Sequence, residues 1–206
     1  MNVTSSEFLP TPRQGEVLDA ALQLLVRAGD RLTMSAVAQQ ASCSKETLYN
    51  WFGDREGLLT AIVKWQASKV GMPVVDAGRL NAKTLRQSIE SFGRNLLGVL
   101  SGDISVALNR VAISHAGSES ANLGDIVLEN GRFAMGRRLK PILEEGRNSG
   151  LLAFEDTEEA FRTFFGLLMR DTQIRLLLGE KFPLGARGIE REAARATEQF
   201  ISLYGT

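Results

Sequence analysis

In the N-terminal third of the chain, apolar residues recur at the three- and four-residue spacing of an amphipathic helix. The first run covers residues 13–28 and stops at Gly29, a residue type that commonly ends helices. Its apolar face consists of Val17, Leu18, Ala21, Leu24, Leu25 and Ala28. The preceding residues, 1–12, carry two prolines and several small polar side chains, so we expect a mobile N-terminal arm there.

A second and a third helix are predicted close together, joined by a tight turn. Thr33 is a good N-cap for the second helix. The apolar stripe of that helix is formed by Met34, Val37, Ala38 and Ala41. Residues 42–44 break the pattern, and Ser44 is placed to cap the third helix, residues 45–52, on a backbone N–H of its first turn.

The third helix has two faces of opposite character. Leu48 and Phe52 are four residues apart and are expected to face inward. The polar outer face is formed by Lys45, Glu46, Thr47, Tyr49 and Asn50. A helix of about eight residues is ~12 Å long, and a DNA major groove is roughly 12 Å wide. The pattern therefore predicts a helix-turn-helix whose second helix is a DNA-recognition helix.

The rest of the chain is also helical in its periodicity. Asp54 is expected to cap a connecting helix that runs to residue 70, and the glycines and proline of residues 71–81 indicate a junction. Pro141 is expected to kink or split the helix that contains it. The predicted C-terminal helices cover residues 82–101, 103–116, 120–149, 157–179 and 187–204.

These patterns predict an all-α fold, because no segment shows sustained period-2 alternation. An N-terminal three-helix head is joined by a connecting helix to a C-terminal helical body. We expect the arm at residues 1–12, the head with its connecting helix at residues 13–70, and the body at residues 71–206.

Charge gives the DNA interpretation no support, since 24 basic and 24 acidic residues leave a net charge of zero. Residues 1–70 hold seven basic and seven acidic side chains, and nonspecific DNA affinity comes mainly from Lys and Arg at phosphates. Binding would then depend on local placement and on two copies acting together. The single cysteine, Cys43, excludes an intramolecular disulfide and fits a reducing cytoplasm. No signal peptide or membrane span is predicted.

Other functional classes have less support in the sequence. The motifs of di-iron sites, zinc proteases, phosphate-binding loops and serine nucleophiles are missing, so no enzyme, metal or cofactor is predicted. A helical protein- or ligand-binding module without DNA affinity remains an alternative, because the head is neutral and Glu46 lies on its outer face.

Two parts of the chain resemble a known family. The sequence VLDAALQLLVRAG, then T-x-x-x-VA, then S-K-E-T-LY-x-x-F-x-D-R-E-x-LL, within residues 13–65, is similar to the DNA-binding domain of TetR/AcrR regulators. FRTFFGLLMRDTQIRLLLG and ATEQFISLYG resemble the C-terminal domain of the AefR-like branch. The resemblance implies a homodimeric repressor of a quasi-palindromic operator, with a body that dimerises and binds a small, mostly apolar inducer.

Carried over by position, the resemblance assigns roles in the head. Major-groove contacts are implied for Lys45, Glu46, Thr47 and Asn50. Phosphate contacts are implied for Thr33, Ser44, Tyr49, Trp51 and Arg55. Ser42 stands where the family usually has glycine, so a left-handed turn there would cost about 1 kcal/mol. Glu46 either accepts a hydrogen bond from a cytosine amino group or repels phosphates.

In the body, aromatic and apolar residues at helical spacing either line the inducer pocket or belong to an ordinary core. The pocket candidates are Phe92, Leu96, His115, Phe133, Phe161, Phe165 and Met169. His115 is alternatively a helix-end residue that complements the dipole. The candidates for the dimer interface are Phe164, Leu168, Asp171, Ile174, Arg175 and Phe200.

Two further features have two interpretations each. The basic residues of the segment 120–149 either attract an acidic inducer or more DNA, or form a solvated face with neighbouring glutamates. They are Arg132, Arg137, Arg138, Lys140 and Arg147. Cys43 is either a redox sensor near DNA or a small apolar plug beneath the turn.

Overall fold

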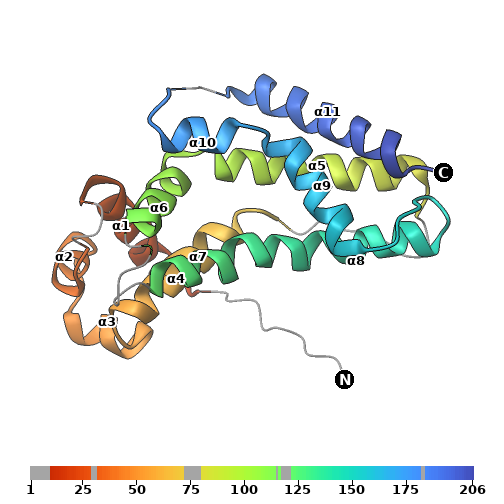
Figure 1. Ribbon diagram of the computed structural model, residues 1–206. Helices are drawn as coiled ribbons and strands as arrows, with labels where there is room; N and C mark the ends of the chain where they lie inside the picture. The colour runs from red at the N-terminus through yellow and green to blue at the C-terminus, as the bar shows by residue number, and fades with distance from the viewer. Residues whose placement is uncertain (1–9, 29–31, 72–79, 115, 117–121, 182–183) are drawn as a thin grey trace. The chain divides into compact units, whose positions relative to one another are not determined.

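The computed structural model describes residues 10–28, 32–71, 80–114, 116, 122–181 and 184–206 (Figure 1). The predicted all-α fold is confirmed: these residues form helices, with one isolated antiparallel bridge between Leu152 and Gly205. The N-terminal helices are α1 (Pro12–Ala28), α2 (Met34–Gln40), α3 (Lys45–Phe52) and α4 (Arg55–Ser68). The others are α5 (Ala82–Leu100), α6 (Asp103–Ser114), α7 (Asn122–Val127), the π-helix η3 (Leu128–Phe133), α8 (Ala134–Asn148), α9 (Thr157–Met169), α10 (Thr172–Leu177) and α11 (Ala186–Tyr204).

The helices form two compact units that are not continuous in sequence. One unit contains residues 1–68 together with residues 107–131, and the other contains residues 69–106 together with residues 132–206. Along the chain the units change after residues 68, 106 and 131, so a segment that follows the junction expected at residues 71–81 returns to the unit that contains the helix-turn-helix. Most of the predicted arm lies outside the described residues.

The first unit is held together by apolar faces that meet inside α1 to α4. Leu18, Leu48 and Ile62, from three different helices, are fully buried. The indole Nε1–H of Trp65 donates to Asp19 Oδ1 at 2.8 Å, which fixes α4 against α1. Helix α7 covers another part of α4 and buries Leu123 and Ile126.

In the second unit, α5, α9 and α11 lie side by side (Figure 1). The rings of Phe164 on α9 and Phe200 on α11 meet edge to face, with centroids 5.6 Å apart. Gly93 allows the Phe164 ring to lie against α5, because a Cβ at this position would lie 3.1 Å from Phe164 Cζ. Helix α8 packs against the other side of α9 and shares Phe161 with it: a Cβ at Gly136 would lie 2.9 Å from that ring.

The segment predicted as one helix at residues 120–149 is interrupted, but not at Pro141. The break is the π-helix η3, and Pro141 lies within the regular helix α8. Pro141 is exposed, so water can replace the backbone hydrogen bond that its ring nitrogen cannot make. The helix is therefore not split at Pro141, and the change of helix type lies earlier, at η3.

The segment predicted as one helix at residues 157–179 is also divided. Arg170 ends α9 with a φ of 45°, and α10 begins at Thr172. Among the described residues, no single helix is both long and apolar enough to cross a membrane. The bent pair α5 and α6 meets that test of length and composition jointly.

Candidate nucleic-acid interface

The turn between α2 and α3 closes on two backbone hydrogen bonds. The Ser42 N–H donates to the Gln39 carbonyl at 3.3 Å, and the Cys43 N–H donates to the Ala38 carbonyl at 3.0 Å. Together they form the helix-terminating motif that requires a left-handed residue after the C-cap. Ser42 is that residue, with a φ of 50°. Ser42 therefore adopts the left-handed backbone conformation that is expected of the glycine usual at this position.

Arg13 fixes this turn from α1. Its Nη2 donates to the carbonyl oxygens of Ala41 at 2.7 Å and Ser42 at 3.2 Å, and its Nη1 pairs with Glu16 at 2.6 Å. These carbonyls end α2, where a positive charge is favourable. Arg13 could not be identified from the sequence, because its partners lie about 28 residues away, beyond any local pattern.

Replacing Ser42 with glycine is expected to raise the free energy of unfolding by up to about 1 kcal/mol, because glycine adopts a positive φ without steric cost. Chemical denaturation followed by circular dichroism measures the change. DNA affinity should stay within twofold of wild type, since both hydrogen bonds of the turn use backbone atoms. A loss of stability would show that the serine side chain makes a favourable contribution that outweighs the strain.

The two helices begin at the caps that the sequence predicted. Thr33 Oγ1 accepts a hydrogen bond from the Ala36 N–H at 3.2 Å, and Ser44 Oγ accepts one from the Thr47 N–H at 3.0 Å. The hydroxyl groups of Ser44 and Thr47 also lie 2.8 Å apart. Ser44 and Thr47 are therefore both tied to the first turn of α3, which fixes where the helix starts.

Burial divides α3 as predicted. Leu48 and Phe52 are buried, whereas Lys45, Glu46 and Asn50 are exposed. Tyr49 is 52% exposed, which is unusual for a large aromatic side chain in a core-forming helix. Thr47 and Trp51 are half-buried, and the Trp51 ring meets Phe52 edge to face with centroids 6.1 Å apart. The caps Thr33 and Ser44 are exposed.

Residues at the start of α4 fix the end of α3 and the start of α2. Asp54 caps α4 by accepting from the Gly57 N–H at 2.8 Å, as predicted, and Gly53 reverses the chain with a φ of 78°. Arg55 Nε donates to the Leu32 carbonyl at 3.0 Å, so part of its guanidinium holds the entrance to α2. Gly57 was not identified from the sequence, although a Cβ there would lie 1.9 Å from the Phe52 carbonyl oxygen.

The result is a rigidly capped short helix that exposes a polar surface with hydrogen-bond donors and acceptors. Such a helix fits a DNA major groove, where side chains read base edges and hydroxyl and indole groups contact phosphates. Lys45 and Glu46 place opposite charges on this surface. Among the described residues, no group of three or more His, Cys, Asp or Glu side chains is placed to hold a metal ion.

Comparison with known proteins identifies both parts of the chain. Residues 17–62 match the bacterial regulatory proteins of the TetR family, and residues 87–206 match the C-terminal domain of AefR-like transcriptional repressors. The chain belongs to the TetR family.

Individual members of the TetR family are similar over different lengths. A TetR transcriptional regulator from Agrobacterium tumefaciens is 47% identical, with a TM-score of 0.82 over 96% of each chain. The flavonoid-responsive regulator FrrA is 28% identical, with a TM-score of 0.69 over 94% of this chain and 97% of that one. The HTH-type transcriptional regulator YvkB of Bacillus subtilis is 36% identical over 61 residues, which span 29% of this chain and 32% of YvkB.

The residues expected to line an inducer pocket in this TetR-family body have diverse environments. Phe92, Leu96, Phe161 and Met169 are buried and Phe165 is half-buried. Phe133 is 48% exposed, so it does not belong to the core. His115 lies outside the described residues. Burial of these four side chains is compatible with core packing, with lining a pocket, or with both.

Three of the residues expected at the dimer interface lie inside a single protomer. Phe164, Leu168 and Phe200 are buried in the packing of α9 against α5 and α11, out of reach of a partner on the surface. The expectation that these three residues contact a second subunit is therefore corrected: their apolar side chains pack inside the core of one protomer. Asp171 is exposed, and Ile174 is 55% exposed on α10. Arg175 pairs with Asp171 at 3.6 Å and with Glu180.

Proposed function

We propose that this TetR-family chain is a homodimeric transcriptional repressor, which two recognition helices hold on a quasi-palindromic operator until a small molecule releases it. The observation that carries the proposal is the exposed polar face of α3, set in place by Ser44, Arg13 and Asp54. Two copies of α3 spaced about 34–36 Å apart would enter successive major grooves. Dimerisation doubles the number of phosphate contacts and thus compensates for a neutral head. The site of action would be the cytoplasm.

The dimer surface proposed in place of the buried residues is the outer side of α9 and α11. Arg195 Nη2 donates to the Leu167 carbonyl at 2.8 Å, and the Tyr204 hydroxyl lies 3.2 Å from Thr163 Oγ1, so the two helices meet along this side. Gly166 lies on α9 with no atom within 4 Å of a Cβ at that position. A glycine inside a helix costs about 1 kcal/mol relative to alanine, and no described residue of the protomer lies close enough to require a glycine at this position. Close approach of a partner helix supplies a reason.

Replacing Gly166 with leucine is expected to raise the dissociation constant of the dimer at least about tenfold, because the side chain would separate closely packed helices. Sedimentation equilibrium at several protein concentrations measures the change. Gly124→Leu is the matched control: it also replaces a helical glycine with open space around it, but lies in the other unit. Equal dimer affinity in both variants and wild type would place the interface elsewhere.

We infer that the inducer is small and mostly apolar, and that the body binds it more tightly when the heads are not bound to DNA. Support comes from the buried aromatic side chains of α5 and α9 and from the relative FrrA, which is named as flavonoid-responsive. Linkage requires that the inducer lower operator affinity by the same factor by which the operator lowers inducer affinity. We also infer that the chain regulates transcription and does not catalyse a reaction.

Selection of bound duplexes from a random DNA pool, followed by titration of the winning sequence at several salt concentrations, tests the proposal. An enriched inverted repeat, bound less tightly as salt rises, is the expected result. Asn50→Ala should relax preference at one base position per half-site, and Lys45→Ala should weaken binding, whereas Lys83→Ala on α5 should change neither. A folded dimer that enriches no sequence and shows no salt dependence would favour the alternative, a helical binding module without DNA affinity.

A further inference from the structure

Arg132 has surroundings unlike those of the other basic residues in its part of the chain. Its guanidinium carbon lies 4.4 Å from the ring centroid of Phe161 and 4.4 Å from that of Phe165. The two rings are 6.2 Å apart and tilted by 58°, so they form an open corner around the charge. Phe161 is fully buried, and Arg132 itself is half-buried. The rings stabilise the cation through their faces, but they offer no acceptor to its N–H groups.

Among the described residues, no carboxylate or carbonyl forms an ion pair or hydrogen bond with Arg132. The neighbouring basic residues are engaged: Lys140 Nζ pairs with Glu158 at 2.9 Å, and Arg138 Nη1 donates to the Val70 carbonyl at 2.7 Å. Arg147 Nη1 donates to the Glu155 carbonyl at 3.3 Å and also lies over the Phe154 ring. The basic cluster is therefore not one solvated face. Within the part of the chain that the structure describes, Arg132 is the member of this cluster whose N–H groups meet no protein acceptor.

The energetic state of Arg132 favours an anion. Burial lowers the pKa of its guanidinium below the usual value. The negative charge of Glu158 opposes this effect, and the positive charge of Arg162 reinforces it. A guanidinium has five N–H donors in a planar fork, and leaving them without acceptors in a partly desolvated place is costly. A carboxylate bound edge-on would satisfy two donors at once, while the aromatic corner would contact the apolar part of the same molecule.

The position in the fold agrees with a ligand site. Arg132 lies on η3, a π-helical turn, and such turns inside α-helices occur frequently at functional sites. The same two phenylalanines are candidates for the apolar pocket, so one end of a ligand would meet aromatic rings and the other the guanidinium. Gly136, one turn later, keeps the space beside Phe161 free of a side chain.

We propose that Arg132, with Phe161 and Phe165, forms an anion-recognition site for a small apolar ligand that carries a carboxylate. The inference rests on the proposed function, because the ligand would be the inducer of the repressor. It narrows that inducer to an acid and assigns one residue to its charged group.

The test follows the side-chain Nε–H signal of Arg132 by NMR in the full-length protein, without DNA. The signal is assigned as the one that the Arg132→Met variant lacks. Sodium benzoate is the probe, benzamide is its neutral match, and ionic strength is held constant with sodium chloride. Benzoate should shift the Arg132 signal saturably, and benzamide should not.

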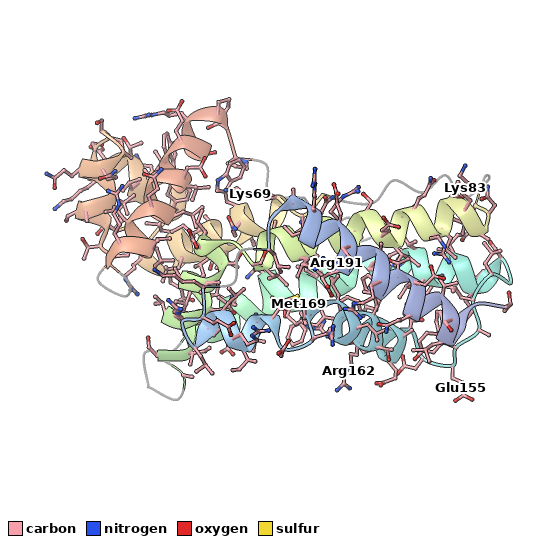
Figure 2. The ribbon with its side chains drawn as sticks, turned by 90° about the horizontal axis from the view of Figure 1, so that it is seen from above. Lys69, Lys83, Glu155, Arg162, Met169 and Arg191 are labelled. Atoms are coloured by element: carbon pink, nitrogen blue, oxygen red, sulfur yellow. The ribbon has the colours of Figure 1, made fainter. Side chains whose placement is uncertain are left out.

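Variants separate the site from general effects. Read from backbone amide signals of η3, Arg132→Met should weaken benzoate binding at least about tenfold, and Phe165→Leu about threefold. Arg191→Met is the matched control, because Arg191 lies on α11 of the same unit (Figure 2), is exposed and pairs with Glu192. It should bind benzoate as wild type does.

Several outcomes would overturn the proposal: no saturable shift with benzoate, an equal shift with benzamide, or undiminished binding in Arg132→Met. An Arg132 signal that instead changes with protein concentration would assign the guanidinium to a carboxylate of a second subunit, which also overturns it. DNA selection is independent of these readings. Wild-type protein that selects an inverted repeat but shows no saturable benzoate shift would overturn the anion site alone, so the repressor proposal would stand.

Discussion

Replacing Phe164 with alanine is expected to lower the free energy of unfolding by about 4 kcal/mol. The Phe164 side chain is 0% exposed, meets Phe200 edge to face, and lies against Gly93 of α5. Alanine would remove the ring and leave a cavity between three helices, which close packing cannot fill. Chemical denaturation followed by circular dichroism measures the loss.

Phe133→Ala is the matched control, since it removes the same ring from a position that is 48% exposed. It should cost less than about 1 kcal/mol. The measurement is repeated over a hundredfold range of protein concentration, because a residue of the protomer core and a residue of a dimer interface respond differently. If the stability loss of Phe164→Ala grows as the protein is diluted, Phe164 belongs to a dimer interface. Similar stability losses in the two variants would contradict its placement in the core.

Replacing Gly57 with alanine is expected to destabilise the protein by about 2 kcal/mol and to lower operator affinity at least tenfold. The added Cβ would lie 1.9 Å from the Phe52 carbonyl oxygen, whereas real Cβ contacts are essentially never shorter than 3.0 Å. The clash is with backbone, so α4 and the end of α3 must move apart by more than 1 Å. The recognition helix would then meet DNA at an altered angle.

Gly124→Ala provides the comparison, because Gly124 is also helical, belongs to the same compact unit and has no atom within 4 Å of its Cβ position. That variant should be neutral or up to about 1 kcal/mol more stable, with wild-type operator affinity. Thermal unfolding and DNA titration are measured for both. Wild-type affinity in Gly57→Ala would show that α3 and α4 separate without disturbing the DNA surface.

Features of the helix-turn-helix that depend on neighbouring residues could be predicted from the sequence. Thr33, Ser44 and Asp54 each cap a helix through a side-chain oxygen that accepts from an N–H three residues later, and this geometry needs no tertiary information. The two faces of α3 follow from periodicity in the same way. Arg13 could not be found, because its contact with the turn is set by how α1 packs.

The body was harder to predict because apolar spacing indicates that a side chain is buried, not which surface buries it. Phe200 satisfies the pattern of a dimer helix equally well whether it faces a partner or its own α9. The prediction of helix breaks has a similar limit: Pro141 is the stronger signal in sequence, yet α8 continues through it and the π-helical turn η3 comes before α8. The sequence does not distinguish Arg132 from the other basic residues of its segment, because ring contacts and ion pairs depend on how the helices pack.

The return of residues 107–131 to the unit of the helix-turn-helix limits how this protein can be taken apart. Helix α7 packs on α4, so residues 1–68 excised alone would expose to water the apolar surface that Leu123 and Ile126 cover. The chain passes between the units three times, near residues 68, 106 and 131. A hybrid regulator that borrows the DNA specificity of a relative therefore needs matching exchanges at all three crossings. A single cut after the connecting helix would join a new head to a foreign α7.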